Sequence, residues 1–587
     1  MTLGEAKNLQ CEAHWRTVLL LGLLFAASSS AYMITLAPMS SFYEEHNTGA
    51  AIVNATSTAL NSLLLPGLLA VLILYARRGV LGYMAILICF ATWIANSVYY
   101  GYFQSPIPLA MASRASALPS VGSHILLQRI SWREVALVGL FVSTLYFFYK
   151  ARRQLWERGT RSIVTFPRVI AYGCIALILL LTLKGAVFAN RYSPNLLMST
   201  NAIESIKKNG FLVFYGSQFL AQFRARTPLP EFPGKINGTA TTTPPTTAAN
   251  RMNIFFLQIE SLDARALDVA LNGERLMPHL NTLKQSAIYC SNFFAQHRAG
   301  ASQDSELSSL YSVIPSNHRP GFSNLRTSDL ESLCEVLKTH GYNQVGFHAN
   351  RGDFFNRKAL FRKTGFDAFV DQAGFTGDAA GWFSKDASFF EQSVQKIREL
   401  PQPFFAYLIT MQSHGPFRNY TKKSEHLNLD NFSVDAQSYL RCMSEVDDAI
   451  GHFLELLAES GLDKNSIVFV FGDHSSKIEY AAPTYQYDGM DMDEHVPLFI
   501  VTPDRSPKTI EKVCSQVDIP PTVCHLLGIP ESDTWLGSSI LSETEGMAIL
   551  NYPAPRVIEN QNSTIRIRNA ERRELDFVEW SEALQDN

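Results

Sequence analysis

Five long apolar stretches fill the first third of the chain, and they limit its possible folds more than any other feature. They cover residues 16–37, 56–76, 80–101, 134–149 and 168–189. A helix needs about 20 mainly apolar residues to cross the hydrocarbon core of a bilayer, and most of these stretches have that length. The fourth is short and relies on its flanking residues. The sequence therefore predicts a transmembrane domain of five helices within residues 1–190.

Basic residues orient these helices. Lys7 and Arg16 precede the first stretch, Arg77 and Arg78 separate the second from the third, and "YKARRQLWERGTR" separates the fourth from the fifth. By the positive-inside rule the N-terminus is cytoplasmic and the chain after residue 190 lies outside. The alternative is a cleaved signal peptide, because "LLLGLLFAASSSA" ends in small residues. The apolar run continues past those residues and four more stretches follow, which favours a membrane anchor.

The remaining two thirds of the chain differ in composition and in the pattern of their apolar residues. Residues 191–250 contain the amphipathic "SIKKNGFLVFYGSQFLAQF" and then "NGTATTTPPTTAAN", a composition typical of a linker. From residue 251 to about 550, short β-type apolar runs alternate with amphipathic helical segments. This alternation predicts an α/β domain with a mostly parallel central sheet and helices on both faces. Residues 551–587 are rich in charge and are predicted to form a peripheral tail.

Charge and cysteine content narrow the function classes. The formal net charge is −3, so no overall positive field points to nucleic acid as a partner. The predicted outside part has five cysteines and no metal-type CxxC spacing. Cys514 and Cys524 can pair in an oxidising compartment, or they can remain buried thiols.

Several apolar runs end at an ionisable residue. "NIFFLQI" is followed by Glu260, "NQVGF" by His348, "FFAYLITMQS" by His414 and "IVFVF" by Gly472, Asp473 and His474, while His495 opens "HVPLFIV". Ligands of open α/β sheets bind beyond the carboxyl ends of the strands, where these side chains are expected to meet. A single such residue is normally part of a loop. Here four predicted strands each deliver an ionisable residue to the same edge. Glu, Asp and His side chains with a serine oxygen are a plausible ligand set for a divalent cation such as zinc or manganese.

The serine is Ser302 in "GASQDSELSSL". A serine hydroxyl is a poor nucleophile near neutral pH, so a catalytic role requires a base or a metal ion that stabilises its alkoxide. The strand-end residues are candidates for supplying that activation. Without it, Ser302 would be an ordinary polar residue at the start of a helix.

Seven separated segments resemble, in order, the lipoteichoic acid synthase branch of the alkaline phosphatase/sulfatase superfamily. They cover about residues 251–530: "IFFLQIES", "MPHLNTLKQSAIYCSNFFAQ", "SQDSELSSLYSVIP", "GFHANRGDFFNRKALFRKTGFDAFVD", "LITMQSHGPF", "VFGDHSS" and "QVDIPPTVCHLLGI". The resemblance implies that Ser302 is the nucleophile. It implies one divalent ion, manganese or zinc, held by Glu260, Ser302, Asp473 and His474. It places the donor headgroup near His348, Phe355, Arg357 and His414.

The resemblance also implies a reaction. Ser302 would take the phosphoglycerol headgroup from phosphatidylglycerol, releasing diacylglycerol, and an acceptor hydroxyl on a glycan or lipid would then remove it. His414 or His495 would move protons, and Arg357 would contact the phosphate through two N–H groups. The expected location is the bacterial inner membrane, in several passes, with the catalytic domain in the periplasm.

Other functions remain as alternatives. Serine stands where that branch usually has threonine, and His495 before "VPLFIV" resembles the phosphoethanolamine transferases, whereas "FFNR" resembles the synthases. A sulfatase-type hydrolase would need C/S-x-P-x-R, but Ser302 is followed by Gln303, Asp304 and Ser305. A receptor built on a degenerate domain would have lost metal ligands, and none of the matched positions is missing.

Overall fold

The computed structural model describes the part of the chain after residue 251 almost fully and the N-terminal part in segments. It describes residues 19–24, 26–35, 69, 80–103, 107, 132–157, 211, 215, 229–238, 252–297, 302–316, 325–352, 357–381, 384–415, 417–480, 486–487, 490–491, 494–551, 555–561 and 564–585. The chain divides into two compact units, residues 1–112 with 122–224, and residues 113–121 with 225–587. Each is considered by itself.

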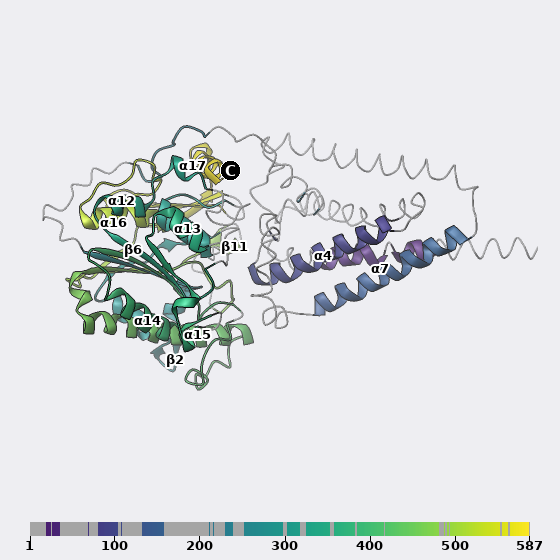
Figure 1. Ribbon diagram of the computed structural model, residues 1–587, viewed down its shortest axis with the longest axis horizontal. Helices are drawn as coiled ribbons and strands as arrows, with labels where there is room; N and C mark the ends of the chain where they lie inside the picture. The colour runs from purple at the N-terminus through teal and green to yellow at the C-terminus, as the bar shows by residue number, and fades with distance from the viewer. Residues whose placement is uncertain are drawn as a thin grey trace, which may run out of the picture. The chain divides into compact units, whose positions relative to one another are not determined.

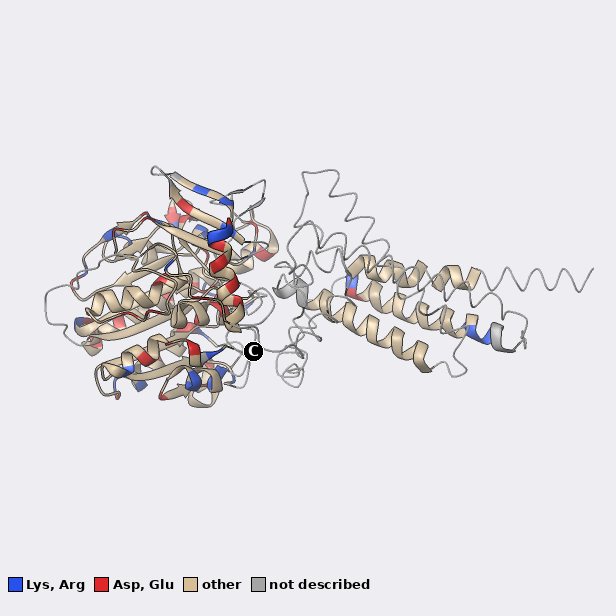
Figure 2. Ribbon diagram, turned by 90° about the horizontal axis from the view of Figure 1, so that it is seen from above, with Lys and Arg blue, Asp and Glu red and all other residues tan. Residues whose placement is uncertain are grey.

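Among the described residues of the first unit, two helices are long and apolar enough to cross a membrane, α4 (Val80–Phe103) and α7 (Trp132–Glu157). Figure 2 shows that both are almost free of charged residues except near the ends of α7. Residues 19–24 and 26–35 are also helical. The predicted third and fourth spans coincide with α4 and α7, whereas the second and fifth lie largely or wholly outside the described residues. A five-helix bundle therefore remains a prediction.

The surface of α7 fits a lipid environment. Val135, Val138, Val142 and Tyr146 are each at least half exposed and recur every three or four residues, which places them along one stripe of the helix. On the other side, Phe141 packs against Phe90 of α4, with ring centroids 5.4 Å apart. An exposed apolar stripe of this length is unusual for a soluble protein and is normal where lipid replaces water.

The second unit is built on an eight-stranded sheet in the order β13-β4-β12-β9-β1-β8-β6-β7. All neighbouring strands are parallel except β12, which runs antiparallel to β9 and β4. This confirms the predicted mostly parallel sheet. The strands are β1 (Asn253–Ile259), β4 (Ile288–Cys290), β6 (Asn343–His348), β7 (Ala368–Val370), β8 (Phe404–Ile409), β9 (Ser466–Gly472), β12 (Leu498–Val501) and β13 (Lys508–Ile510).

Helices cover both faces of this sheet, as predicted (Figure 1). The side chains of β1 alternate between two cores: Ile254 and Phe256 join the first, and Phe255, Leu257 and Ile259 join the second. The first core includes residues of α11 (Ser302–Tyr311), α12 (Leu333–Thr339), α13 (Arg357–Thr364), α16 (Ile519–Leu527) and α17 (Arg572–Gln585). The second includes residues of α10 (Pro278–Leu283), α14 (Asp386–Ile397) and α15 (Val434–Ser460).

The C-terminal residues are not a peripheral tail. They form a three-stranded antiparallel sheet, β15 (Met547–Asn551), β16 (Pro555–Gln561) and β17 (Thr564–Asn569), followed by α17. Phe577, Trp580 and Leu584 of α17 are buried in the first core. Their spacing of three and four residues gives the helix one apolar face. The composition of the segment does not reveal this face, because charged residues are numerous on the rest of the helix.

We predict that Trp580→Ala destabilises the second unit by about 3–5 kcal/mol, because truncating a buried tryptophan leaves a cavity. The Trp580 ring packs against Phe232, with centroids 5.0 Å apart. Urea denaturation followed by circular dichroism measures the change. Arg573→Ala is the matched control on the exposed face of α17 and should stay within about 0.5 kcal/mol of the parent. Equal stability of the two variants would mean that α17 does not contribute to the core.

Candidate active site

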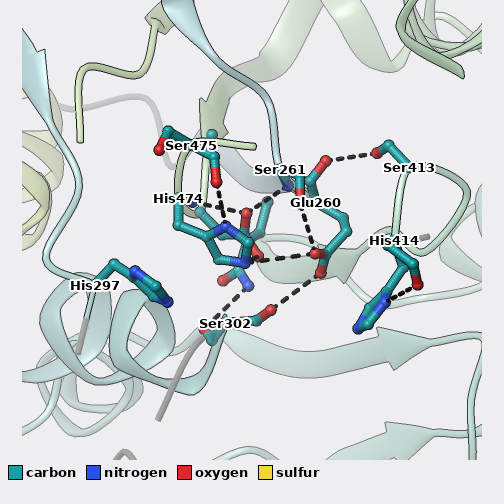
Figure 3. Close-up of polar contacts among 12 residues, drawn as sticks. Glu260, Ser261, His297, Ser302, Ser413, His414, His474 and Ser475 are labelled. Carbon is teal, nitrogen blue, oxygen red and sulfur yellow. Dashed lines mark hydrogen bonds and ion pairs between the residues drawn. The ribbon is translucent and has the colours of Figure 1, made fainter. Parts of the chain in front are cut away.

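Four strands deliver functional side chains to one edge of the sheet. Glu260 follows β1, His348 ends β6, His414 follows β8, and Asp473 with His474 follows β9. β1 is paired with β9 so that Ile259 lies opposite Gly472, and the residues that follow, Glu260 and Asp473, emerge side by side. The predicted convergence is therefore present in the structure (Figure 3).

Glu260 is the centre of this arrangement. Its side chain is buried, and its Oε2 accepts a hydrogen bond from Ser302 Oγ at 3.0 Å, while Oε1 accepts one from Ser261 Oγ at 2.9 Å. Ser302 is the first residue of α11, so the positive end of the helix dipole lies at its hydroxyl. The structure thus places the candidate nucleophile in contact with the candidate ligand set.

Asp473 and His474 complete a group that can hold a cation. One ligand atom from each of Glu260, Asp473 and His474 lies within 4.8 Å of the others. Asp473 Oδ1 accepts hydrogen bonds from the backbone N–H groups of Ser261 and His474. Its buried Oδ2 lies 3.7 Å from His474 Nε2 and has no hydrogen-bond partner among the described residues. His474 Nδ1 lies 2.9 Å from the carbonyl of Ser475, which leaves Nε2 facing the carboxylates. An orphaned carboxylate oxygen beside an oriented imidazole is what a divalent cation would satisfy.

Two backbone features allow the turn after β1 to lie close to the end of β9. Ser261 has φ +53°, a left-handed conformation that costs a non-glycine residue about 1–2 kcal/mol and here aims its N–H at Asp473. Gly472 lies where an added Cβ would come within 2.3 Å of the Leu262 carbonyl. The turn after β1 and the end of β9 therefore touch through their backbones, and a side chain at position 472 would separate them.

Electrostatics agree with a cation site. Burial by itself raises the pKa of Glu260, but His414 and His474 hold that pKa well below its ordinary value. Burial and the neighbouring charge of Glu260 raise the pKa of Asp473. Burial lowers the pKa of His474, yet Asp473 and Glu260 outweigh it and raise that pKa to about 10. Two buried carboxylates thus require positive charge, which a proton on His474 or a metal ion can supply.

Arg357 and His348 lie close together but are engaged with the protein. Arg357 Nε and Nη2 donate to Glu306 Oε1 at 2.9 and 2.6 Å, and its Nη1 lies 2.9 Å from His348 Nε2. His348 Nδ1 in turn lies 3.1 Å from the carbonyl of Ile409. Glu306 is one helical turn after Ser302 in α11. Of the five N–H groups of a guanidinium, these contacts use three, and within the described part of the chain the other two have no hydrogen bond to protein.

The remaining predicted site residues are His414, His495 and Phe355, and they differ in where they lie. His414 is partly buried, and its Nδ1 lies 3.0 Å from the Gly415 carbonyl; in Figure 3 it flanks Glu260 on the side opposite His297. His495 begins at the same sheet edge, but its Nε2 lies 2.7 Å from the Ser291 carbonyl and its ring packs on Phe294. Phe355 lies outside the described residues.

Comparison with known proteins identifies the domain. Residues 252–529 match the sulfatase family model. A lipoteichoic acid synthase-like protein of Bacillus subtilis is 27% identical over 481 residues, 76% of each chain. The crystal structure of the lipoteichoic acid synthase LtaP from Listeria monocytogenes matches 59% of this chain and 94% of its own, with 25% identity and a TM-score of 0.51. Residues 252–529 form a sulfatase-family domain of the alkaline phosphatase superfamily.

A further solved structure shares the fold over a longer range than this sulfatase-family domain. The structure of the integral membrane lipooligosaccharide phosphoethanolamine transferase A of Neisseria meningitidis matches 88% of this chain and 96% of the Neisseria chain, with 14% identity and a TM-score of 0.55. At that identity the likeness shows the fold alone.

One cluster of ionisable side chains in the sulfatase-family domain, His297 with Glu494 and Lys477, was not predicted from the sequence. The His297 ring lies 4.7 Å from the His474 ring (Figure 3), and its Nδ1 is 3.1 Å from Glu494 Oε1. Glu494 also forms an ion pair with Lys477. Burial by itself raises the pKa of Glu494, but Lys477 and His297 hold it well below its ordinary value. No strand of the main sheet ends at His297, so the strand-end pattern could not reveal it.

We predict that the sulfatase-family domain binds a divalent cation more tightly as the pH rises. Protons on Asp473 and His474, whose pKa values are raised, compete with the ion, so affinity should increase by about tenfold per pH unit for each proton displaced. Competition with a metal-sensitive dye between pH 6 and 8 measures this. His474→Gln should weaken binding at least about tenfold.

The control is His452→Gln, which removes a histidine of α15 whose Nε2 lies 3.0 Å from Glu391. Its metal affinity should equal that of the parent. Affinity that is independent of pH, or equal loss in both variants, would contradict the assignment of His474 as a ligand.

Proposed function

We propose that this protein is a membrane-anchored, metal-dependent transferase that moves phosphoglycerol from phosphatidylglycerol to an extracytoplasmic acceptor. The observation that carries the proposal is the hydrogen bond from Ser302 Oγ to Glu260, beside Asp473 and His474. The likeness to lipoteichoic acid synthases supports the substrate class. The carboxylates, the imidazole and Ser302 would hold one divalent ion, manganese or zinc, which supplies Lewis acidity at the serine and phosphoryl oxygens.

In the first half-reaction Ser302 Oγ bonds to phosphorus as the bond to the diacylglycerol oxygen breaks. The hydrogen bond to Glu260 orients the Ser302 hydroxyl, and the proton passes on to solvent, because the pKa of Glu260 lies well below its ordinary value. We assign His414 to donate a proton to the departing oxygen, because it flanks Glu260 (Figure 3) and is only partly buried. The products are diacylglycerol and a phosphoglycerol ester of Ser302.

In the second half-reaction an acceptor hydroxyl attacks the same phosphorus and Ser302 leaves. His414 takes the proton of the acceptor, and the Ser302 oxygen takes up a proton from solvent as its bond to phosphorus breaks. The two uncommitted N–H groups of Arg357, with His348 beside them, are assigned to the headgroup or its phosphate. As the family resemblance implies, Phe355 is assigned to the donor headgroup. His495 is assigned to substrate binding and is a second candidate for proton transfer.

Donor choice provides the central test. We predict that labelled phosphatidylglycerol releases diacylglycerol, that Ser302→Ala abolishes the release, and that Ser302→Thr, which keeps the hydroxyl, retains measurable activity. Mass spectrometry of the trapped protein should find phosphoglycerol on Ser302. Diacylglycerol release from phosphatidylethanolamine alone, with a phosphoethanolamine adduct, would replace this proposal with the phosphoethanolamine transferase that the fold of the Neisseria protein also fits.

Membrane orientation provides a second test. The proposal includes a five-span domain over residues 1–190, a connector over 191–250 and a catalytic domain in the periplasm, anchored in the bacterial inner membrane. A reporter that works only outside the cytoplasm should be active when fused after residue 190 and inactive when fused near residue 158. The reverse pattern would place the site away from outer-leaflet lipid and exclude this donor. Equal activity at both positions would rule out the fifth span.

A further inference from the structure

The loop after β8 carries His414, and hydrogen bonds fasten it to the neighbouring strand β1. The Glu260 backbone N–H donates to Thr410 Oγ1 at 3.0 Å, and Ser413 Oγ donates to the Glu260 carbonyl at 2.5 Å (Figure 3). The His414 N–H donates to the Met411 carbonyl at 3.0 Å, which closes the turn. On this side the loop is therefore joined to the chain segment that supplies a candidate metal ligand.

A buried carboxylate holds the other side of the loop. Asp386 is the first residue of α14, and its Oδ1 accepts hydrogen bonds from the backbone N–H groups of Met411 and Gln412, at 3.2 and 3.1 Å. In return, the Asp386 N–H donates to Gln412 Oε1 at 2.9 Å, which satisfies one of the orphan N–H groups at the start of the helix. The Asp386 side chain is fully buried, so water does not compete for these bonds.

Gln412 extends this contact to a second helix. Its Nε2 donates to Glu445 Oε2 of α15 at 2.7 Å. The other oxygen of that carboxylate accepts hydrogen bonds from the Thr421 N–H, the Thr421 hydroxyl and Ser424 Oγ, at 2.6 to 2.8 Å. Gln412 and Glu445 are buried as well. One amide side chain thus bridges two buried acidic residues, and we call Asp386, Gln412 and Glu445 the loop clamp.

Burying the loop clamp costs free energy. Asp386 Oδ2 is buried and has no hydrogen-bond partner among the described residues, and burial raises the pKa of this carboxyl to about 7. An asparagine side chain could accept the same two backbone N–H groups without a buried charge. Interactions that weaken a fold persist mainly at functional sites. The segment held here is the one that carries His414.

Proton transfer by His414 requires that its ring be held in one place. His414 Nδ1 lies 3.0 Å from the Gly415 carbonyl, so Nδ1 carries a hydrogen and the transferable proton is on Nε2. Diacylglycerol leaves through an alkyl oxygen, which is a strong base and departs slowly without a proton. General acid catalysis adds about 10²–10⁴-fold to such a step, and a displacement of about 1 Å can cost about a hundredfold.

Given the phosphoglycerol transfer proposed above, on which this inference rests, we propose that the loop clamp positions His414 and so enables the site to act on alkyl phosphodiesters. Its three members are positioning residues, since they contact the loop and not the substrate. In the step concerned, the Ser302 oxygen bonds to phosphorus as the bond from phosphorus to the diacylglycerol oxygen breaks. The Nε2 proton of His414 passes to that oxygen.

The test compares two donors with the full-length protein in nanodiscs. One donor is labelled phosphatidylglycerol at varied mole fraction, and the other is glycerol 4-nitrophenyl phosphate, whose nitrophenolate leaves without a proton. Gln412→Met keeps the length of the side chain and removes both of its hydrogen bonds. Its kcat/KM for diacylglycerol release should fall about a hundredfold. Its kcat/KM for nitrophenolate release should stay within about threefold of the parent, because this ratio reports only the first half-reaction.

Two further variants separate positioning from folding. Gln412→Glu combined with Glu445→Gln exchanges donor and acceptor and keeps one charge, so it should restore diacylglycerol release to within about fivefold of the parent. Gln392→Met removes another glutamine of α14, which is hydrogen-bonded to Thr376, and should leave both donors unaffected. The metal affinity of Gln412→Met should equal that of the parent, because the side chain is bonded to the clamp and not to the metal ligands.

Folding of each variant is checked by circular dichroism. If Gln412→Met does not fold, Glu445→Gln alone takes its place. This substitution keeps an acceptor for Thr421 but turns a second amide donor toward Gln412, and it should show the same split between donors, about tenfold in size.

Equal loss with both donors would overturn the inference, because Gln412 would then be purely structural. Unchanged diacylglycerol release in Gln412→Met would overturn it too, as would metal affinity lost together with activity. Failure of the proposed function is distinguishable, since the parent would then release no diacylglycerol from phosphatidylglycerol. The same comparison would then be made with phosphatidylethanolamine and ethanolamine 4-nitrophenyl phosphate, and equal loss with that pair would reject the role of the clamp.

Discussion

Two carboxylates, Glu260 and Asp473, are buried side by side, and the rest of the site depends on that juxtaposition. The parallel pairing of β1 with β9 imposes it, because Ile259 opposite Gly472 leaves the next residue of each strand at the same level. Neighbouring buried carboxylates cannot both remain ionised without positive charge close by. His474 and the candidate cation meet that requirement, and the Ser302 hydroxyl, bonded to Glu260, shares the environment that results.

The part of the site that lies at strand ends could be predicted from the sequence, since parallel strands carry their terminal residues to one edge. Glu260, His348, His414, Asp473 and His474 were found in this way. The same periodicity gave the central sheet and its two helical layers. Ser302 was singled out by its polar segment and by the family resemblance, because a residue at a helix N-terminus carries no strand pattern that marks its position.

Other features depend on contacts that no local pattern contains. His297 meets His474 through a loop, and its partner Glu494 is about 200 residues away in the chain. The C-terminal helix was assigned to a peripheral tail because its charges dominate the composition. The apolar spacing of Phe577, Trp580 and Leu584 was nonetheless present in the sequence and could have indicated a packed helix.

The two faces of α13 show how neighbouring cations can serve different ends. Inside, Arg357 has its charge balanced by the buried Glu306, so it presents directed N–H groups with little net charge. That environment suits neutral hydroxyls together with a phosphate oxygen. Outside, Lys358 pairs with Asp371, and Arg362 is exposed to solvent. A guanidinium whose charge is balanced by a buried carboxylate binds a headgroup by the direction of its N–H groups, whereas an exposed surface cation attracts anions only by its charge.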